Sequence, residues 1–248
     1  MRKYGTYLLS FLVVLALWEW ACRQQIWTPY ILPSPERVWE TAQRMLADGE
    51  LLHHVLVSTK RILWGFFWAF LLSCIFSGIG LLMPKLAVWY GGILEVFRHV
   101  PPLSLIPLLI LWFGIGELPK TIIIVLASFF PIFLNMQDGL ARCDARLLEV
   151  GRMLHFTPLQ QLWQIRLPAA LPGILTGMKV GMGYSLRAII GAEMIAADQG
   201  LGYLILDAQA MSRSDKVIIG ILAIGCLGLL LDGLFYLLTY VALPYERS

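Results

Sequence analysis

Charged residues are scarce in this chain of 248 residues. Asp, Glu, Lys and Arg together make up 14% of it, whereas hydrophobic residues make up 58%. Soluble domains carry about 25% charged residues, so this composition excludes a soluble globular protein. The 19 Lys and Arg residues exceed the 16 Asp and Glu residues by only three, and no block of like charges occurs. We therefore expect no nucleic-acid partner.

Motifs for nucleotide, metal and disulfide chemistry are also missing. No Gly-x-x-x-x-Gly-Lys-Ser/Thr phosphate loop occurs, so the chain has no ATP-binding motif of its own. The cysteines lack the paired spacing of a zinc site or redox motif: Cys22, Cys74, Cys143 and Cys226. No cluster of His, Asp or Glu recurs at helical spacing within the apolar segments. We expect no catalytic residue, cofactor or metal on this chain, and no enzyme activity.

Long apolar runs fill the sequence instead. Four of them carry no Asp, Glu, Lys or Arg: 62–83, 100–116, 121–137 and 217–231. A helix of about 20 apolar residues spans the ~30 Å hydrocarbon core of a bilayer. Two further helices are expected, an uncleaved first one after Arg2 and Lys3 and another that begins at Leu167-Pro168. The sequence thus predicts an all-α polytopic membrane protein with about six transmembrane helices.

The polar segments suggest two regions. Residues 1–57 are predicted to hold the first membrane helix and an extracytoplasmic connector, and residues 58–241 the core with a hydrophilic loop at 138–166. Within the connector, Ser34-Pro35-Glu36 is typical of a helix start, with an N-cap followed by proline. The spacing of apolar residues after it predicts a short amphipathic helix on the membrane surface.

Positive charges do not decide the topology. With the amino terminus inside, one side holds nine Lys and Arg residues, among them Arg2, Lys3 and Arg247, and the other holds eight. The cytoplasmic side normally carries a clear excess of such residues, so this small difference leaves both orientations open.

Prolines interrupt the third apolar region. Arg98 and Pro101-Pro102 stand between two apolar stretches that would otherwise continue as helix. Non-helical backbone survives at membrane depth only where it is buried in protein or lines a water-filled cavity. Residues 98–102 are therefore a candidate element of a translocation pathway, and an ordinary turn at the membrane surface is the alternative.

The hydrophilic loop carries a spaced motif. Glu149-Val150-Gly151 is followed by three residues, His155, nine residues, Ile165, one residue and Leu167-Pro168. Apolar residues between the charges would give a short amphipathic helix suited to a groove on a partner protein. These residues are Leu147, Leu148, Leu154, Phe156, Leu159 and Leu162.

This spacing resembles the coupling loop of binding-protein-dependent ABC importer permeases, Glu-Ala-Ala, three residues, Gly, nine residues, Ile-x-Leu-Pro. Two positions differ, because Val150-Gly151 replaces the alanine pair and His155 replaces the glycine. Other stretches are similar to the branch that serves aliphatic sulfonate, taurine and nitrate importers: 31–35, 100–103, 107–114, 192–194 and 200–203. Related permeases of that branch import pyrimidine vitamin precursors.

The resemblance implies a type I ABC importer permease fold. The chain would be the membrane-spanning subunit that translocates a small substrate, expected to be an anion such as a sulfonate, taurine or nitrate. The implied partners are an ABC ATPase subunit that binds ATP and Mg, a second permease copy in a homodimer, an extracytoplasmic substrate-binding protein and membrane lipid. The implied location is the bacterial cytoplasmic membrane.

The resemblance also places the ATPase-coupling residues within the loop: Glu149, Val150, Gly151, Leu154, His155, Phe156, Thr157, Leu159, Ile165, Leu167 and Pro168. Two alternatives stay open for the function. One is a pyrimidine or vitamin-precursor importer of the same family. The other is a secondary transporter, which usually shows paired broken helices, whereas only one strongly broken helix is evident here.

The fifth predicted membrane helix carries two further features. Gly173, Gly177 and Gly181 recur every four residues, a pattern that allows close helix packing, either at a dimer interface, which we favour, or within the chain. Arg187 and Glu193 are costly inside a span, and their six-residue separation puts them on nearly opposite faces. Arg187 is our candidate for the anion pathway, with snorkelling or a structural pair as alternative. All pathway candidates are Arg98, Pro101, Pro102, Arg187 and Glu193.

Overall fold

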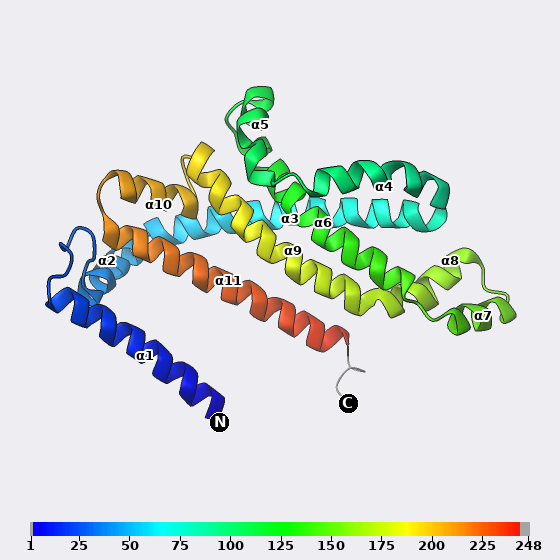
Figure 1. The fold of residues 1–248 in the computed structure, drawn as a ribbon, viewed down its shortest axis with the longest axis horizontal. Coiled ribbons are helices and arrows are strands. Elements are labelled where there is room, and N and C mark those ends of the chain that lie inside the picture. Colours follow the sequence, from blue (N-terminus) through cyan, green and yellow to red (C-terminus); the bar gives the residue numbers. More distant parts are fainter. Residues whose placement is uncertain (1, 244–248) are drawn as a thin grey trace.

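Long helices form one elongated bundle, with shorter helices at both of its ends (Figure 1). The computed structural model describes the backbone of residues 2–243 and the side chains of residue 9 and residues 12–243. No strand occurs in this part of the chain. Three of its helices are long and apolar enough to cross a membrane: α3 (Glu50–Leu82), α6 (Glu117–Ala141) and α11 (Ser214–Ala242). The predicted all-α membrane fold is confirmed.

Two further spans are bent, which raises the number to as many as five within the described residues. The first joins α4 (Pro84–Arg98) at 87° to the short helix η1 (Pro102–Leu105) and α5 (Ile106–Phe113). The proline-rich break therefore exists, and α5 projects from the side of the bundle (Figure 1). The second joins the helical run Pro158–Ala196, which ends with α9 (Leu167–Ala196), at a bend of 44° to α10 (Leu201–Ala210).

The expected first membrane helix corresponds to α1 (Arg2–Arg23). The side chains of Arg2 and Lys3, and all of Arg247, lie outside the described part of the chain. A total of six membrane helices and the balance of positive charge consequently remain predictions. In the ribbon, α1 approaches the bundle only where it joins the connector (Figure 1).

The connector helix α2 (Pro35–Ala47) forms as the sequence predicts. Ser34 is its N-cap and accepts a hydrogen bond from the backbone N–H of Arg37 at 3.3 Å, with proline in the first turn. One face of α2 is buried against α3 and α11, and there the Thr41 hydroxyl donates to Asp215 at 2.9 Å. Helix α2 is thus held to the bundle by both apolar packing and a buried hydrogen bond.

The predicted boundary between residues 57 and 58 is wrong as a boundary of structure, because it falls inside α3. Polar residues before Ser58 suggested a loop, but the helix already begins at Glu50. Those polar groups have partners in folded protein: Glu50 pairs with Lys216 at 2.6 Å, and His54 accepts a hydrogen bond from the backbone of Gly200 at 3.0 Å. Tertiary contacts therefore extend the helix through a polar stretch.

The glycines of α9 pack against α6 of the same chain. A Cβ atom at Gly177 would lie 2.7 Å from Cβ of Asn135 and 3.1 Å from the backbone oxygen of Pro131. The corresponding atom at Gly181 would lie 2.7 Å from Cγ1 of Ile132, and at Gly173 the backbone oxygen of Asn135 is 3.0 Å away. The face that we assigned by preference to a dimer interface is already covered by α6, so the packing is within the chain.

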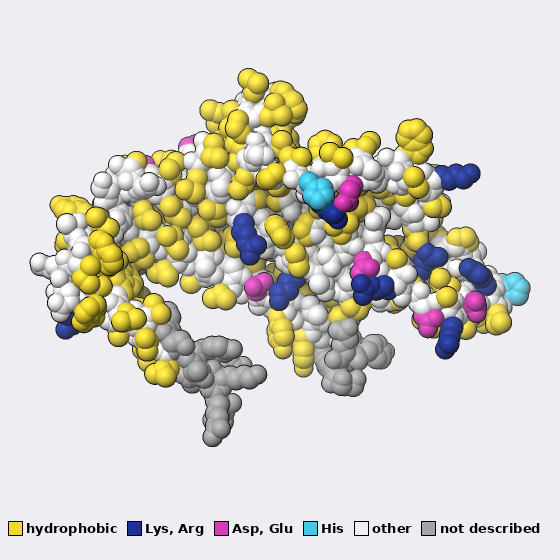
Figure 2. Space-filling model, viewed as in Figure 1, with side chains coloured by type: hydrophobic (Ala, Val, Ile, Leu, Met, Phe, Trp, Pro, Cys, Tyr) yellow, Lys and Arg dark blue, Asp and Glu magenta, His cyan; other side chains and the backbone are white. Residues whose placement is uncertain are grey.

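The two ends of the bundle differ in chemistry. One end holds α10 and α2, and the other holds α7 (Ala145–Met153), α8 (Pro158–Gln161) and η2 (Leu162–Arg166) (Figure 1). In the space-filling view, charged side chains gather over the α7–α8 end, whereas hydrophobic side chains cover most of the remaining face (Figure 2). The hydrophilic loop is therefore separated from the apolar body of the molecule.

Candidate functional site

The hydrophilic loop folds as a helix, a tight turn and a second short helix. After α7 ends, the backbone N–H of His155 donates to the oxygen of Arg152 at 3.0 Å, and that of Phe156 donates to the oxygen of Gly151 at 2.9 Å. These two bonds define a Schellman motif, in which the residue after the C-cap adopts a left-handed conformation and is usually glycine. His155 occupies that position with φ of 55°. The turn thus has a geometry that favours glycine, although histidine stands there.

Gly151 is needed because the next helix packs directly on it. Gly151 is buried, and a Cβ atom there would lie 2.6 Å from Cδ1 of Ile165 and 3.6 Å from Cδ2 of Phe156. Thr157 then starts α8 with a capping box, since its hydroxyl accepts from the N–H of Gln160 and Gln160 accepts from the N–H of Thr157. The spacing from Gly151 to Ile165 consequently fixes how the two helices of the loop close together.

The outer surface of this loop carries accessible apolar side chains among its charged ones. Glu149 is exposed, and so are six large hydrophobic side chains, each at least 50% accessible: Leu147, Val150, Met153, Leu154, Leu159 and Trp163. Three of our coupling residues instead lie partly buried where the loop meets α9, namely Phe156, Ile165 and Leu167, and the buried Gly151 lies beside them. Pro168 follows in the first turn of α9. A helical loop with an exposed apolar face is suited to bind a groove on a partner.

Three of the five pathway candidates line one cavity. This Arg187 cavity has a volume of about 550 Å³ and lies between the α4–α5 break, α6 and α9. Its lining includes Arg98, Pro102 and Arg187. Pro101 is exposed and is not among its lining residues, and Glu193 lies elsewhere. The cavity thus joins two arginines that are far apart in the sequence.

Arg187 itself has an aromatic neighbour and, among the described side chains, no acidic one. Its guanidinium lies 5.6 Å from the ring centroid of Tyr184, within the range of a cation–π contact. Among the described side chains no carboxylate comes within ion-pair distance of Arg187. Aromatic and aliphatic side chains make up most of the remaining lining. The cavity is therefore suited to a small anion with an apolar part.

Arg98 borders a second cavity as well. This Tyr90 cavity has a volume of about 380 Å³ and lies between α4 and α6, with Tyr90, Glu95 and Gln137 among its polar lining. Arg98 is paired there with Glu95, at 2.5 Å between Nη2 and Oε1. The two arginines of the first cavity thus differ, because one carries an acidic partner and the other does not.

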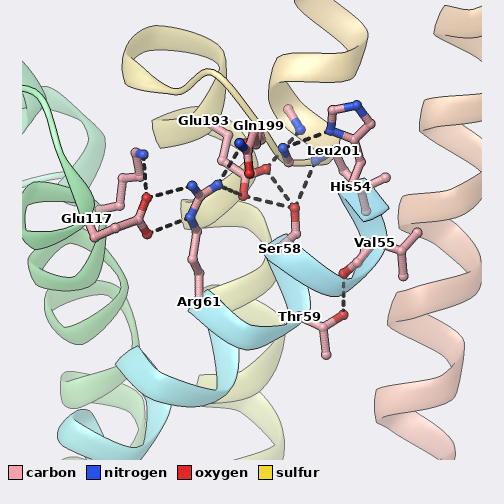
Figure 3. Close-up of polar contacts among 12 residues, drawn as sticks. His54, Val55, Ser58, Thr59, Arg61, Glu117, Glu193, Gln199 and Leu201 are labelled. Carbon is pink, nitrogen blue, oxygen red and sulfur yellow. Dashed lines mark hydrogen bonds and ion pairs between the residues drawn. The ribbon is translucent and has the colours of Figure 1, made fainter. Parts of the chain in front are cut away.

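Glu193 belongs to a polar cluster at the end of the bundle remote from the hydrophilic loop. We call it the Arg61 cluster (Figure 3). Its side chain is completely buried, and Arg61 on α3 contacts it at 2.9 Å. The same guanidinium binds both oxygens of Glu117 on α6, at 2.6 and 2.7 Å, and Lys120 adds a contact to Glu117 at 2.9 Å. Arg61 thereby links three helices, α3, α6 and α9.

The backbone after α9 completes the Arg61 cluster. The Ser58 hydroxyl donates to Glu193 and accepts from the N–H of Leu201 at 2.8 Å, while the N–H of Gly202 donates to Glu193 at 3.0 Å. Gly200 has φ of 116°, and a Cβ atom there would overlap the Glu193 carboxylate. The segment from Glu193 to Gly202 thus places an acidic side chain against two glycines, Gly200 and Gly202, which leave room for its carboxylate.

Sequence reasoning missed Arg61 and Glu117 as parts of this cluster. The available signal was the position of Arg61 directly before a long apolar run, where an unpaired charge would be costly. Glu193, a pathway candidate, has a structural partner in Arg61 instead of facing either of the two cavities described above. The expectation that Arg187 and Glu193 do not pair agrees with their placement.

The family model for binding-protein-dependent transport system inner membrane components matches residues 61–239 of this chain. The chain belongs to this family. It is 33% identical to a candidate aliphatic sulfonates transport permease protein, SsuC, of Bacillus subtilis (strain 168), with 100% of this chain and 90% of the relative covered. It is 34% identical to the taurine transport system permease protein TauC of Escherichia coli (strain K12), with 89% of this chain and 82% of the relative covered.

Solved structures show the same fold. An inward-facing structure of the MetNI methionine ABC transporter matches this permease with a TM-score of 0.61 at 17% identity, covering 77% of this chain and 95% of the other. The family model and the two relatives make the chain a membrane-spanning permease subunit of an ABC importer, and the secondary-transporter alternative is set aside. Membership of this family implies an ATPase partner and a substrate-binding protein, and it makes the chain a multi-pass membrane protein.

Proposed function

We propose that this permease translocates a small organic sulfonate, such as an aliphatic sulfonate or taurine. The observation that carries the proposal is the Arg187 cavity, which brings Arg98 and Arg187 together in an otherwise largely apolar lining. A planar guanidinium can donate two parallel hydrogen bonds to two oxygens of a sulfonate, as it does to a carboxylate or a phosphate. Relatives named for sulfonate and taurine transport support the same substrate class.

The position of Arg187 supports a pathway role over a lipid-facing one. Arg187 lies inside α9, which forms part of a bent membrane span, and its side chain is exposed in the single chain. Placing an arginine in the hydrocarbon core costs about 2.5–3.5 kcal/mol on insertion scales, so such residues face protein or water. A second copy of the permease, in a homodimer around a shared path, supplies the surroundings that Arg187 requires.

The loop at the α7–α8 end is proposed to bind the ATPase subunit. Its exposed apolar face, with Met153 79% accessible, has a shape and chemistry suited to a groove. Glu149, Val150, Leu154 and His155 lie on or beside this face, while Gly151 keeps its two helices in contact. The ATPase binds ATP and Mg, and this chain carries no cofactor and no enzyme activity of its own.

The orientation of the permease in the membrane follows from the contact between the loop and the ATPase. With the loop at 138–166 on the cytoplasmic side, α2 and the Arg61 cluster lie on the extracytoplasmic side, where the substrate-binding protein delivers its ligand. We place the assembly in the bacterial cytoplasmic membrane, where lipid covers the apolar outer surface. The described apolar helices support a membrane position.

Uptake measurements test the substrate class. Radiolabelled taurine or methanesulfonate should accumulate in cells that express the complete transporter, and Arg187→Gln should reduce the initial rate at least ten-fold. Arg23→Gln is the matched control, because Arg23 is an exposed arginine of α1 that lines neither cavity. If the cells took up a pyrimidine vitamin precursor and no sulfonate, the proposed substrate class would be wrong, and the chain would serve a vitamin-precursor importer of the same family.

A further inference from the structure

Arg98 stands where the Arg187 cavity and the Tyr90 cavity meet. The Arg187 cavity touches α6 between Leu126 and Asn135, and the Tyr90 cavity touches it between Phe130 and Gln137. Since α6 runs toward the α7–α8 end, the Tyr90 cavity lies closer to that end. Arg98 lines both, together with Phe130 and Leu134. A solute that moves from the middle of the bundle toward the hydrophilic loop would pass this guanidinium.

The acidic partner of Arg98 lies on one side of this junction. Glu95 lines the Tyr90 cavity but not the Arg187 cavity, and it sits one helical turn before Arg98 on α4. His99 also approaches the Glu95 carboxylate, at 3.6 Å. Side-chain accessibilities of 38% for Arg98 and 56% for Glu95 leave the pair open on one side. Such open pairs contribute about 0–1 kcal/mol, so an incoming anion can compete for the guanidinium.

We propose that Glu95 is a specificity-determining residue, the resident anion on Arg98 that a transported anion displaces as it leaves the Arg187 cavity. The proposal rests on the anionic substrate proposed above. An arriving anion takes over Arg98 while Glu95 swings away, and Glu95 then reclaims Arg98 and releases the anion into the Tyr90 cavity. Arg98 thereby has an anionic partner at each stage of the passage.

Two consequences follow from this exchange. A solute without an anionic group has nothing with which to displace Glu95, so the closed Glu95–Arg98 pair discriminates against it. An anion does not remain bound to Arg98, because Glu95, one turn away on the same helix, competes with it for the guanidinium. Conduction needs binding that permits entry but is weak enough for departure. Without Glu95, Arg98 would hold the anion longer and transport would slow.

Charge-selective labelling measures the effect on Arg98 directly. Leu134→Cys places a probe at the junction, in a background in which the four native cysteines are serine. The purified permease–ATPase complex in nanodiscs is labelled with an anionic sulfonatoethyl methanethiosulfonate and, separately, with its cationic trimethylammonium counterpart. Glu95→Gln should raise the ratio of anionic to cationic rates roughly five-fold, since it removes a negative charge next to the probe. Glu95→Asp should leave the ratio near that of the parent.

Glu19→Gln provides the matched control. Glu19 forms a similar exposed pair, with Arg23 at 2.7 Å within one helix, and lines neither cavity, so its loss should not change the ratio. An unchanged ratio in Glu95→Gln would overturn the proposal.

Transport separates this inference from the proposed function. With saturating loaded binding protein, Glu95→Gln should lower substrate turnover several-fold, and Glu95→Asp should recover most of it. Full turnover in Glu95→Gln, while Arg187→Gln remains inactive, would overturn the role of Glu95 and leave the anion pathway intact. Absence of sulfonate uptake by the unmodified complex would instead overturn the proposed substrate, and the labelling ratio would still decide whether Glu95 neutralises Arg98.

Discussion

Arg61 and Glu193 are joined by an ion pair of 2.9 Å although 132 residues separate them in the chain. Arg61 is 9% accessible and Glu193 is completely buried, so water does not reach the Glu193 carboxylate to replace Arg61. Their contact lies where α9 bends into α10, and it links this bend to α3 and, through Glu117, to α6. One guanidinium thus fixes the relative positions of the helices at the end remote from the hydrophilic loop.

Removal of Arg61 should strongly destabilise the permease. Arg61→Met leaves the Glu193 carboxylate buried without its cation, and breaking a buried pair in this way costs about 3–5 kcal/mol. Glu193→Gln should cost less, because Arg61 keeps both bonds to Glu117. Thermal unfolding of the purified protein in detergent measures both effects.

The control for this pair is Arg23→Met, which removes an exposed partner of Glu19 and should change stability by less than about 0.5 kcal/mol. The double variant Arg61→Met with Glu193→Gln should lose less than the sum of the two single losses, because the residues share one interaction. Strict additivity would show that the pair does not contribute as a unit.

Gly177 and Gly183 allow a comparison within one helix. Gly177→Ala forces a Cβ atom to within 2.7 Å of Asn135 and 3.1 Å of the Pro131 backbone, whereas nothing lies within 4 Å of the same atom at Gly183. Overpacking of this kind costs about 1–3 kcal/mol, so Gly177→Ala should unfold at a lower temperature. Gly183→Ala should be neutral or slightly stabilising, since alanine is the better helix former. Equal effects of the two variants would contradict close packing of α6 on α9.

His155 should tolerate replacement by glycine but not by valine. Its φ of 55° is unfavourable for a residue with a Cβ atom by roughly 1–2 kcal/mol, and glycine is free of that penalty. We expect His155→Gly to keep transport and to raise the unfolding temperature slightly. His155→Val should lower both, because a branched side chain rarely adopts a left-handed conformation. Loss of transport in His155→Gly alone would show that the imidazole has a role beyond the turn.

Two changes in the same loop should uncouple the permease from its ATPase. Glu149→Lys reverses an exposed charge beside the apolar face, and Gly151→Trp pushes α7 away from Ile165. In both variants, transport should fall at least ten-fold and less ATPase should copurify with the permease. Glu40→Lys, an exposed acid on α2 at the far end of the bundle, should leave the ATPase bound. Normal copurification of ATPase with both loop variants would argue against docking here.

Sidedness can be tested with single cysteines. Asp48→Cys at the end of α2 should react with an impermeant thiol reagent in intact cells, whereas Arg146→Cys in α7 should react only after permeabilisation. Both positions are exposed, and neither side chain has an ion-pair partner among the described residues. The opposite labelling pattern would invert the proposed topology.

Local features of this permease could be predicted from the sequence because their causes lie within a few residues. The cap at Ser34 starts α2, Pro101-Pro102 breaks the third apolar region, and the apolar runs define the membrane helices. The spacing around Glu149 and Ile165 was sufficient to identify the family, since it reflects how two short helices close on Gly151.

Other features depended on contacts between distant segments, which no local pattern encodes. The start of α3 at Glu50 depends on partners such as Lys216, and the partner of the α9 glycines is α6 and not a second copy. Arg98 and Arg187 meet at one cavity only because the α4–α5 break folds against α9. The sequence by itself thus determined the helices and the family, through hydrophobic length and local backbone preference. Which charges are paired and which face a cavity was decided by the tertiary structure, because burial and ion pairing depend on distance in space.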